Sequence, residues 1–259
     1  MQHSNKYIIG FAVAVCMVCS IFVAGSAVGL KDRQDVNKAL DRQKKVLSVA
    51  GLLTADESLS AEEVQQRYDK NIRPMVVNLA TGEYDDSIDA ASYDQKKASK
   101  DPATRKKAPA NGAKVAWLPT HALIYLQVDG EEVKKVILPV EGKALWSTLY
   151  GFLALEADGN TVAGLTFYDH AETPGLGGEV DNPDWKALWP GRKAFDASGT
   201  PQLRVIKGKA GPPDVAPHDV DGLSGATLTC NGVRDLILFW LGENGFGPYL
   251  KSKFPAAGR

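Results

Sequence analysis

The chain begins with a long apolar segment, which runs from Ile8 to Leu30 and holds 23 residues without a charged side chain. A helix rises by about 1.5 Å per residue, so a helix of this length spans the roughly 30 Å hydrocarbon core of a membrane. A cleaved signal peptide is the alternative, because Ala24-Gly25-Ser26-Ala27 has the small residues of a cleavage site. The apolar region of a signal peptide is shorter, however, at about 7–15 residues. We therefore expect residues 1–30 to form a retained anchor that spans the membrane at residues 8–30.

Helical patterns continue after the apolar segment. Apolar residues recur at helical spacing between Asp32 and Leu47, and Gly51 follows as a residue that commonly ends helices. Ser60-Ala61-Glu62-Glu63 has the form of a capping box, in which a serine and a glutamate satisfy the first free amides of a helix. A second short helix is therefore predicted from this point, and it should end before Pro74 because proline disfavours a helical residue ahead of it.

A basic, proline-containing stretch comes next, at residues 94–109. It carries six Lys or Arg, two Pro and no large apolar residue. Such a composition cannot bury much apolar surface, so a solvated loop or insertion is predicted. Residues 31–110 together are expected to be a helical and insertion region between the anchor and the main domain.

The middle of the chain favours β-strands. Apolar residues alternate loosely over two pairs of segments, and a turn-forming Asp-Gly lies between the partners of each pair. The first pair is 122–128 and 133–140 around Asp129-Gly130; the second is 149–155 and 162–168 around Asp158-Gly159. Residues 203–206 form a further short strand pattern. Helical patterns lie before and after these strands and do not alternate with them, which is typical of an α+β fold.

The predicted fold class is therefore α+β, with an antiparallel or mixed sheet and flanking helices, preceded by one N-terminal transmembrane helix. The sheet-containing domain is expected to cover residues 111–259.

One stretch near the C-terminus carries candidate chemistry. Residues 221–229 read Asp-Gly-Leu-Ser-Gly-Ala-Thr-Leu-Thr, and a helical pattern starts directly afterwards, with apolar residues on one face: Val233, Leu236, Ile237, Trp240 and Leu241. Thr227 is thus placed at or near a helix N-terminus, where free amides and the helix dipole favour a phosphate. A threonine after a glycine turn is also an ordinary helix cap. The residues alone leave both interpretations open.

A second stretch, Glu172-Thr173-Pro174-Gly175-Leu176-Gly177-Gly178, follows a predicted strand. It is not the phosphate-binding loop of nucleoside triphosphatases, because it lacks Gly-Lys-Ser/Thr. It is not a dinucleotide-binding turn either, because it has no Gly-x-Gly-x-x-Gly that opens a helix. Its glycines permit close approach of the backbone to a flat ligand, and a plain turn is the alternative.

Composition narrows the function classes. With 30 basic and 31 acidic residues the formal charge is −1, which gives no case for a nucleic-acid partner. Cys230 is the only cysteine outside the apolar segment, so no iron–sulfur cluster is expected. Cys16 and Cys19 form a Cys-x-x-Cys, but they lie within the apolar run and no second pair is near, so no metal is predicted there.

Both stretches resemble the signatures of the FMN-binding domain family. In that family a flavin transferase esterifies the phosphate of FMN onto the threonine after Gly-Ala, which corresponds to Thr227. The other motif positions match Asp221, Ser224, Gly225, Ala226 and Thr229.

The resemblance also implies that the loop with Glu172, Thr173, Leu176 and Gly177 lies against the flavin ring. Glu172 could equally be a surface carboxylate. Trp146-Ser147 is a third matching element, and Trp146 is interpreted either as a flavin contact or as a core residue.

Within this family, the run at 145–155 and the chain length resemble the C subunits of the sodium-translocating NADH:quinone oxidoreductases. The resemblance implies a covalent-FMN electron carrier in a sodium-pumping NADH:ubiquinone oxidoreductase, which passes electrons between partner subunits. No nicotinamide-binding turn is found, so a stand-alone dehydrogenase is not expected. The alternatives are the G subunit of the related Rnf complex, a membrane-anchored module that binds a phosphorylated ligand noncovalently, and a purely structural component of a complex.

The side of the membrane on which the domain lies can be judged from the charges that flank the apolar segment and from the resemblance. Basic residues are more frequent after the apolar segment than before it, and a simple positive-inside count would place the domain in the cytoplasm. Long domains cross membranes largely regardless of flanking charge, so this count is weak. The resemblance implies a single-pass protein of the bacterial inner membrane with a periplasmic domain.

Overall fold

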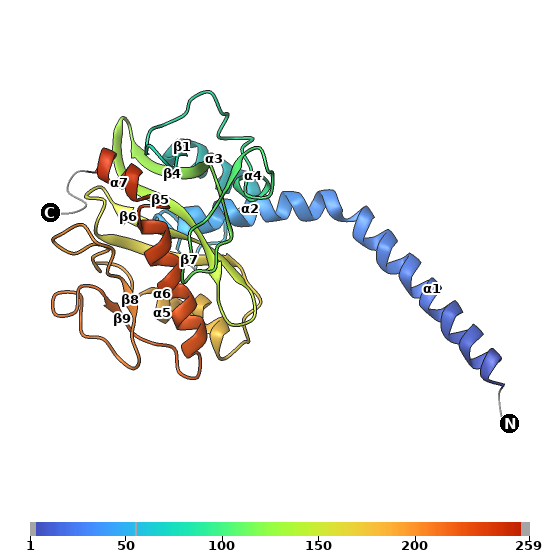
Figure 1. Ribbon diagram of the computed structural model, residues 1–259. Helices are drawn as coiled ribbons and strands as arrows, with labels where there is room; N and C mark the ends of the chain where they lie inside the picture. Colours follow the sequence, from blue (N-terminus) through green and yellow to red (C-terminus); the bar gives the residue numbers. More distant parts are fainter. Residues whose placement is uncertain (1–3, 55, 255–259) are drawn as a thin grey trace. The chain divides into compact units, whose positions relative to one another are not determined.

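The computed structural model describes residues 4–54 and 56–254, which divide into two compact units at the boundary between Arg42 and Gln43. The first unit contains α1 (Asn5–Gly29), drawn in dark blue in Figure 1. Among the described residues, α1 is the one helix long and apolar enough to cross a membrane, and it buries none of its residues. The helix predicted over the apolar segment is thus confirmed. Cys16 and Cys19 lie on it as free thiols.

Both helices predicted after α1 are present. α2 covers Lys31–Val49, and Gly51 follows with a φ of +77°, a left-handed conformation that glycine adopts at little cost. α3 (Ala61–Asn71) opens with the predicted capping box. Glu63 N–H donates to Ser60 Oγ at 3.3 Å, and Ser60 N–H donates to Glu63 Oε2 at 2.8 Å. Two amides that the helix leaves free are satisfied in this way.

The centre of the second unit is a five-stranded antiparallel sheet in the order β1-β4-β5-β6-β7. Its strands are β1 (Ile72–Asn78), β4 (His121–Asp129), β5 (Glu132–Lys143), β6 (Thr148–Glu156) and β7 (Val162–Asp169). Both predicted hairpins are confirmed, with Gly130 and Gly159 at positive φ in their turns. The strand β1 was not predicted, because Pro74 lies within it; proline is tolerated there since β1 is an edge strand.

The segment expected to be helical and inserted therefore contributes to the sheet. It also contains α4 (Gln95–Ala98) and β2 (Arg105–Lys107), which pairs with β3 (Trp117–Pro119). The prediction of a solvated loop at residues 94–109 was thus wrong in part. The guanidinium of Arg105 lies 4.0 Å from the centre of the Trp117 ring, so this polar strand is held partly by a cation–π contact.

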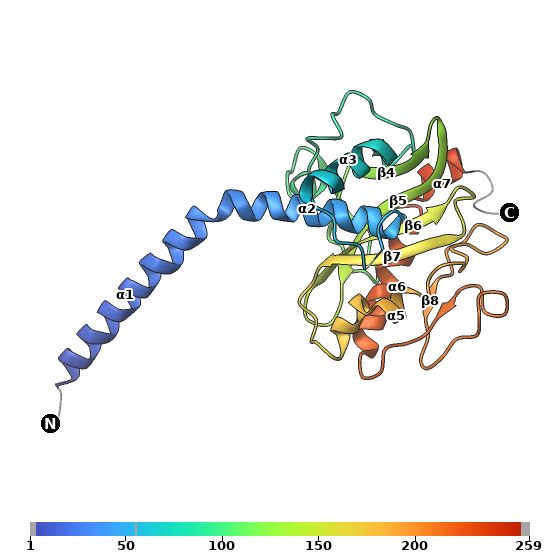
Figure 2. The same cartoon turned by 180° about the vertical axis from the view of Figure 1, so that it is seen from behind.

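The sheet is covered on both faces, which explains why the alternation in its sequence is loose. In β5, Val136, Leu138 and Val140 belong to the main core with α6 (Thr227–Leu241), whereas Ile137 is buried on the other face. That other face meets α3, where the Tyr68 ring packs edge-on against Tyr125 of β4. Figures 1 and 2 show α6 and α3 on opposite sides of the strands.

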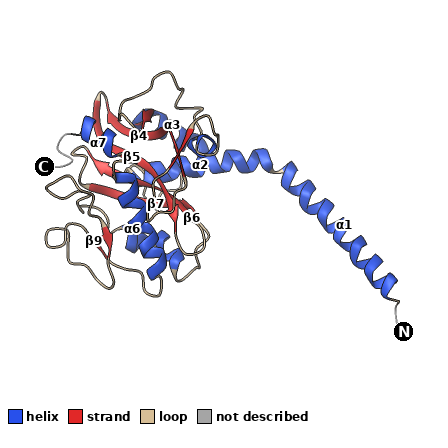
Figure 3. Cartoon of the chain, viewed as in Figure 1, coloured by secondary structure: helices blue, strands red, loops and turns tan. Residues whose placement is uncertain are grey.

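The connection between β7 and α6 is long and mostly irregular, as Figure 3 shows in tan. It contains four short elements, η1 (Gly177–Asp181), α5 (Pro183–Lys186), β8 (Arg204–Val205) and β9 (Asp219–Val220). β8 and β9 pair in parallel, so the structure holds an antiparallel sheet and a small parallel one. The predicted strand at 203–206 is confirmed in a shorter form. The last helix is α7 (Gly247–Lys253).

Candidate functional site

Thr227 is the first residue of α6 and its side chain is exposed. The N-cap position is Ala226, and it makes no side-chain cap hydrogen bond. Among the described residues, the Thr227 hydroxyl has no hydrogen-bond partner, and the amides of Thr227, Leu228 and Thr229 have no acceptor. The interpretation of Thr227 as a helix cap was therefore wrong. The hydroxyl lies beside three free amides at the positive end of a 15-residue helix.

The turn before Thr227 depends on Gly225, which has a φ of +71°. Ala226 is 3% exposed, so its small side chain fits into the core, while Ser224 and Gly225 remain exposed. Because Ala226 is anchored in the core, the residues on either side of it, Gly225 and Thr227, lie at the surface.

Asp221, the leading acid of the motif, binds a neighbouring segment of the chain. Its Oδ1 accepts a hydrogen bond from Ala210 N–H at 2.8 Å, and its carbonyl accepts one from Trp185 Nε1 at 2.8 Å. Next to it, Gly222 N–H donates to Gly208 O at 2.9 Å. These two bonds hold the segment at Gly208 and Ala210, which follows Lys207, against residues 221–222.

Glu172 is buried, with an exposed fraction of 5%, so the interpretation as a surface carboxylate was wrong. Its Oε1 accepts hydrogen bonds from Trp146 N–H and Ser147 N–H, each at 3.0 Å, and from Ser147 Oγ at 3.1 Å. Its Oε2 accepts one from Thr229 Oγ1 at 2.7 Å. Burial by itself would raise the pKa of Glu172, but the hydrogen bonds from Thr229, Trp146 and Ser147 outweigh it and lower the pKa below the ordinary value.

Thr229, the trailing threonine of the motif, is fully buried and is the residue that binds Glu172. Gly177 packs over this pair: a Cβ at that position would lie 2.5 Å from Thr229 Oγ1 and 2.9 Å from Glu172 Oε2. The two sequence signatures, one around Glu172 and one around Thr227, are therefore joined by a direct hydrogen bond. Sequence patterns placed both signatures but gave no sign of this bond.

Exposed apolar side chains are carried by three segments that the contacts of Glu172 and Gly225 join at the start of α6. Trp146 is 68% exposed and Leu176 is 44% exposed, so the interpretation of Trp146 as a core residue was wrong. Leu176 lies against the turn at Gly225, because a Cβ on Gly225 would come within 2.9 Å of Leu176 Cδ2. We call the exposed apolar residues of these three segments the apolar rim: Leu145, Trp146, Leu176 and Leu228.

The loop that carries Leu176 is shaped by its own backbone. Thr173 O accepts hydrogen bonds from Leu176 N–H at 3.1 Å and from Gly178 N–H at 2.8 Å, and Gly175 has a φ of +76°. The side chain of Thr173 is exposed. The loop thus holds Leu176 and Thr173 at the surface while Gly177 passes beneath them.

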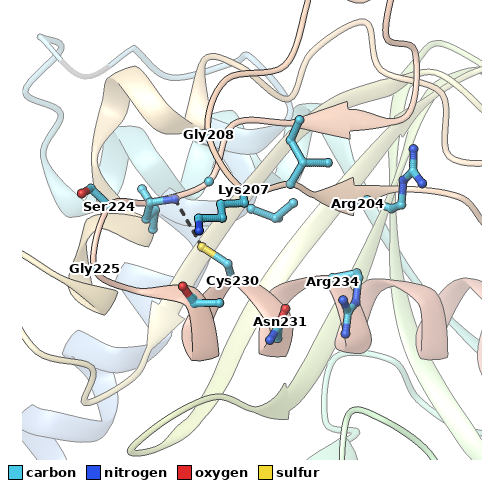
Figure 4. A pocket seen from close by; sticks show the side chains of 13 residues that line it. Arg204, Lys207, Gly208, Ser224, Gly225, Cys230, Asn231 and Arg234 are labelled. Atoms are coloured by element: carbon cyan, nitrogen blue, oxygen red, sulfur yellow. Dashed lines mark hydrogen bonds between the residues drawn. The ribbon is translucent and has the colours of Figure 1, made fainter.

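A pocket of about 620 Å³ opens next to Thr227, and Figure 4 shows the side chains that line it. Lys207 extends over the first turns of α6, and Arg204 and Arg234 lie farther along. The two arginines form ion pairs with Asp219 and Asp235, each at 2.8 Å. Asn231 and Arg234 follow Thr227 at helical spacing, so the sequence could have indicated them; Arg204 is brought in by the irregular connection and could not be found this way.

We also searched the described residues for side chains that could bind a metal ion. Within residues 4–54 and 56–254, no cluster of three or more His, Cys, Asp or Glu side chains is placed to hold a metal ion. Cys230 lines the pocket but is 5% exposed, and burial raises the pKa of its thiol.

The site therefore offers three chemically different surfaces around one free hydroxyl. The basic pocket and the free amides of α6 suit a phosphate, and the apolar rim suits a flat aromatic ring. A flavin mononucleotide has both groups, so the residues present fit this cofactor.

Comparison with known proteins agrees with this interpretation. Residues 145–242 match the FMN-binding domain family, a range that includes the apolar rim, the basic pocket and α6. In solved structures, the fold is similar to NqrC of Shewanella oneidensis, with a TM-score of 0.75 and 33% identity over 82% of this chain and 96% of that one. The C subunit of the Na(+)-translocating NADH-quinone reductase from Parabacteroides distasonis matches with a TM-score of 0.64 at 25% identity, over 87% and 96%.

Relatives that match along nearly the whole chain are more informative still. The C subunit of the Na(+)-translocating NADH-quinone reductase from Vibrio parahaemolyticus is 47% identical over 255 residues, covering 96% of this chain and 95% of its own. The corresponding protein of Pseudomonas aeruginosa is 47% identical over 252 residues, covering 96% of each. The chain belongs to the NqrC family, the C subunits of Na(+)-translocating NADH-quinone reductases, and is a subunit of that membrane enzyme complex.

Proposed function

We propose that this protein carries FMN as a phosphoester on Thr227 and passes electrons between partner subunits of the complex. The observation that carries the proposal is the free, exposed hydroxyl of Thr227 in the lining of a basic pocket, beside Leu228 and close to the contact of Leu176 with the Gly225 turn. When attached, FMN would supply one- and two-electron redox chemistry that the amino-acid side chains of the chain lack.

Different residues near Thr227 would bind the phosphate and the ring of the flavin. The free amides of Thr227, Leu228 and Thr229 and the ammonium of Lys207 would stabilise the negative charge of the phosphoester. Trp146 and Leu176 would contact the ring, and the exposed Thr173 would offer a polar group beside it. The Thr227 oxygen would attack the FMN phosphorus of an activated donor, a flavin dinucleotide, whose phosphoanhydride bond breaks and releases a nucleoside monophosphate. The hydroxyl proton of Thr227 would be lost in this step, and no hydrogen bond among the described residues has to break for it.

Maturation is expected to require a flavin transferase, as in the family that the motif resembles. The exposed residues Ser224, Gly225, Thr227 and Leu228 present the attachment site to such an enzyme, whereas Thr229 is buried and inaccessible. We place the domain on the periplasmic side of the bacterial inner membrane, with residues 8–30 retained as the anchor.

The test is in-gel flavin fluorescence under denaturing conditions. We expect the full chain, expressed with its transferase, to give a fluorescent band that Thr227→Ala abolishes and Ser224→Ala retains. Noncovalent binding would give a flavin that is lost on denaturation, and a purely structural protein would give no flavin at all. A fluorescent Thr227→Ala band, with the flavin mapped to Ser224 or Thr229, would show that the attachment residue is wrong.

A further inference from the structure

We propose that Glu172 is a positioning residue, which couples the Trp146 loop to the first turn of α6 and so fixes the Trp146 ring relative to a flavin on Thr227. The inference rests on the proposed function, because it concerns the orientation of the attached flavin. It adds a role for a residue that would otherwise be interpreted as a contact of the flavin ring.

Three segments that are distant in the sequence meet at the Glu172 carboxylate. The Trp146 loop, at residues 145–147, donates three hydrogen bonds to Oε1, and α6 donates one to Oε2 through Thr229. The loop is tied once more, because Ala171 N–H donates to Ser147 Oγ at 2.9 Å. Each carboxylate oxygen thus serves a different partner: Oε1 holds the loop and Oε2 holds the helix that carries Thr227.

The same contacts show that Glu172 acts through other residues. Four donors occupy the carboxylate, and Gly177 covers it from the third segment, so only 5% of the residue remains exposed. Trp146 is the opposite case: its backbone amide is fixed by Glu172, while its side chain is 68% exposed. The carboxylate therefore fixes the backbone that carries the indole, while its own oxygens are occupied by donors of the loop and of α6.

Substitutions can separate the two sides of this connection: the loop arm, which is the set of hydrogen bonds to Oε1, and the helix arm, which is the hydrogen bond from Thr229 to Oε2. Glu172→Leu has no oxygen, so it removes both the hydrogen bonds from the Trp146 loop and the one from α6. Thr229→Val removes only the helix arm and keeps the shape of the side chain, whereas Thr229→Ser keeps the hydroxyl. Thr161→Val is the matched control, because it removes a threonine–carboxylate hydrogen bond of the same kind, to Asp158 in the turn between β6 and β7.

The first measurement is the fluorescence yield per covalent flavin in the full chain, purified in detergent after expression with the transferase. An indole in contact with a flavin quenches its fluorescence by electron transfer, so Trp146→Leu defines the unquenched level. We expect Glu172→Leu and Thr229→Val to raise the yield several-fold toward that level. Thr229→Ser and Thr161→Val should stay at the wild-type yield. Wild-type yields in Glu172→Leu and Thr229→Val would overturn the inference.

The second measurement needs no flavin. In the Thr227→Ala chain, amide hydrogen exchange at residues 146 and 147 should be slow, and adding Glu172→Leu should accelerate it several-fold, while adding Thr161→Val should not. Unchanged exchange would overturn the inference. A wild-type chain without a fluorescent denatured band would instead refute the proposed function, and these exchange rates would still decide whether Glu172 holds the loop.

Discussion

Gly232 sets how closely α6 approaches the end of β5, and its replacement by alanine is the most direct test of this packing. A Cβ at Gly232 would lie 2.7 Å from Lys143 O and 2.8 Å from Ala144 Cα, both of them backbone atoms. The approach is reciprocal, because a Cβ at Gly142 would lie 2.5 Å from Leu236 Cβ on the same helix. No change of a side-chain rotamer can relieve a contact with backbone, so either the helix or the strand end must move.

Two effects of Gly232→Ala oppose each other. Alanine favours a helix interior over glycine by about 1 kcal/mol, which would stabilise the chain. Ordinary contact begins near 3.4 Å, so the backbones must separate by about 0.7 Å. Overpacking of this kind costs about 1–3 kcal/mol, and contacts with backbone belong at the upper end of that range. We expect a net loss of about 1–2 kcal/mol in the free energy of unfolding.

The assay is urea unfolding of the full chain in a mild detergent, followed by tryptophan fluorescence, with the midpoint shift converted through the unfolding slope. Gly232→Val should cost more than Gly232→Ala. Adding Ala144→Gly to Gly232→Ala should restore only a small part, because it removes the Ala144 Cβ contact and leaves both backbone contacts. A Gly232→Ala chain more stable than wild type by about 1 kcal/mol, as at an open helical position, would refute the close approach.

The remaining predictions concern acid stability and topology. Burial opposes ionisation of Glu172, but its hydrogen bonds lower the pKa, so its contribution to stability is complete above the unfolded pKa of about 4.3 and is lost as the pH falls through the lower folded pKa. Unfolding measured from about pH 6 down to pH 3 should therefore show a smaller acid loss in Thr229→Val than in wild type, and parallel curves would contradict this assignment. For topology, a C-terminal alkaline phosphatase fusion should be active and a C-terminal cytoplasmic reporter silent. The mature N-terminus should precede Ile8, and a mature chain that starts near Ala27 would contradict the retained anchor.

Local patterns predicted the elements whose determinants are local. The two Asp-Gly turns, the capping box at Ser60 and the apolar face of α6 each involve residues within a few positions of one another, and each is present. The elements that were missed depend on distant partners. β1 contains Pro74 and is stable as a strand because β4 pairs along one of its edges, while β2 is polar and is held by β3.

In the candidate site, too, the features that depend on neighbouring residues could be predicted and those that depend on distant ones could not. The sequence predicted Thr227 at a helix N-terminus, and helical spacing alone could have added Asn231 and Arg234. The role of Glu172 could not be predicted, because its partners Trp146 and Thr229 lie 26 and 57 positions away. Whether a loop carboxylate is buried or exposed depends on which donors the tertiary fold brings to it.

In the motif at residues 221–229, four residues have a structural role in the fold, and the hydroxyl of Thr227 has none. Asp221 holds a neighbouring turn, Gly225 provides a positive φ, Ala226 fills the core and Thr229 binds Glu172. A hydroxyl that capped α6 would give up that cap on esterification, at a cost of about 0.5–2 kcal/mol. Thr227 stands one residue inside the helix, where its hydroxyl caps nothing while the free amides of the first turn still face a phosphate. A flavin esterified on Thr227, as we propose, would therefore break no cap of the helix, and the bond between Thr229 and Glu172 would still connect this turn to the backbone of Trp146.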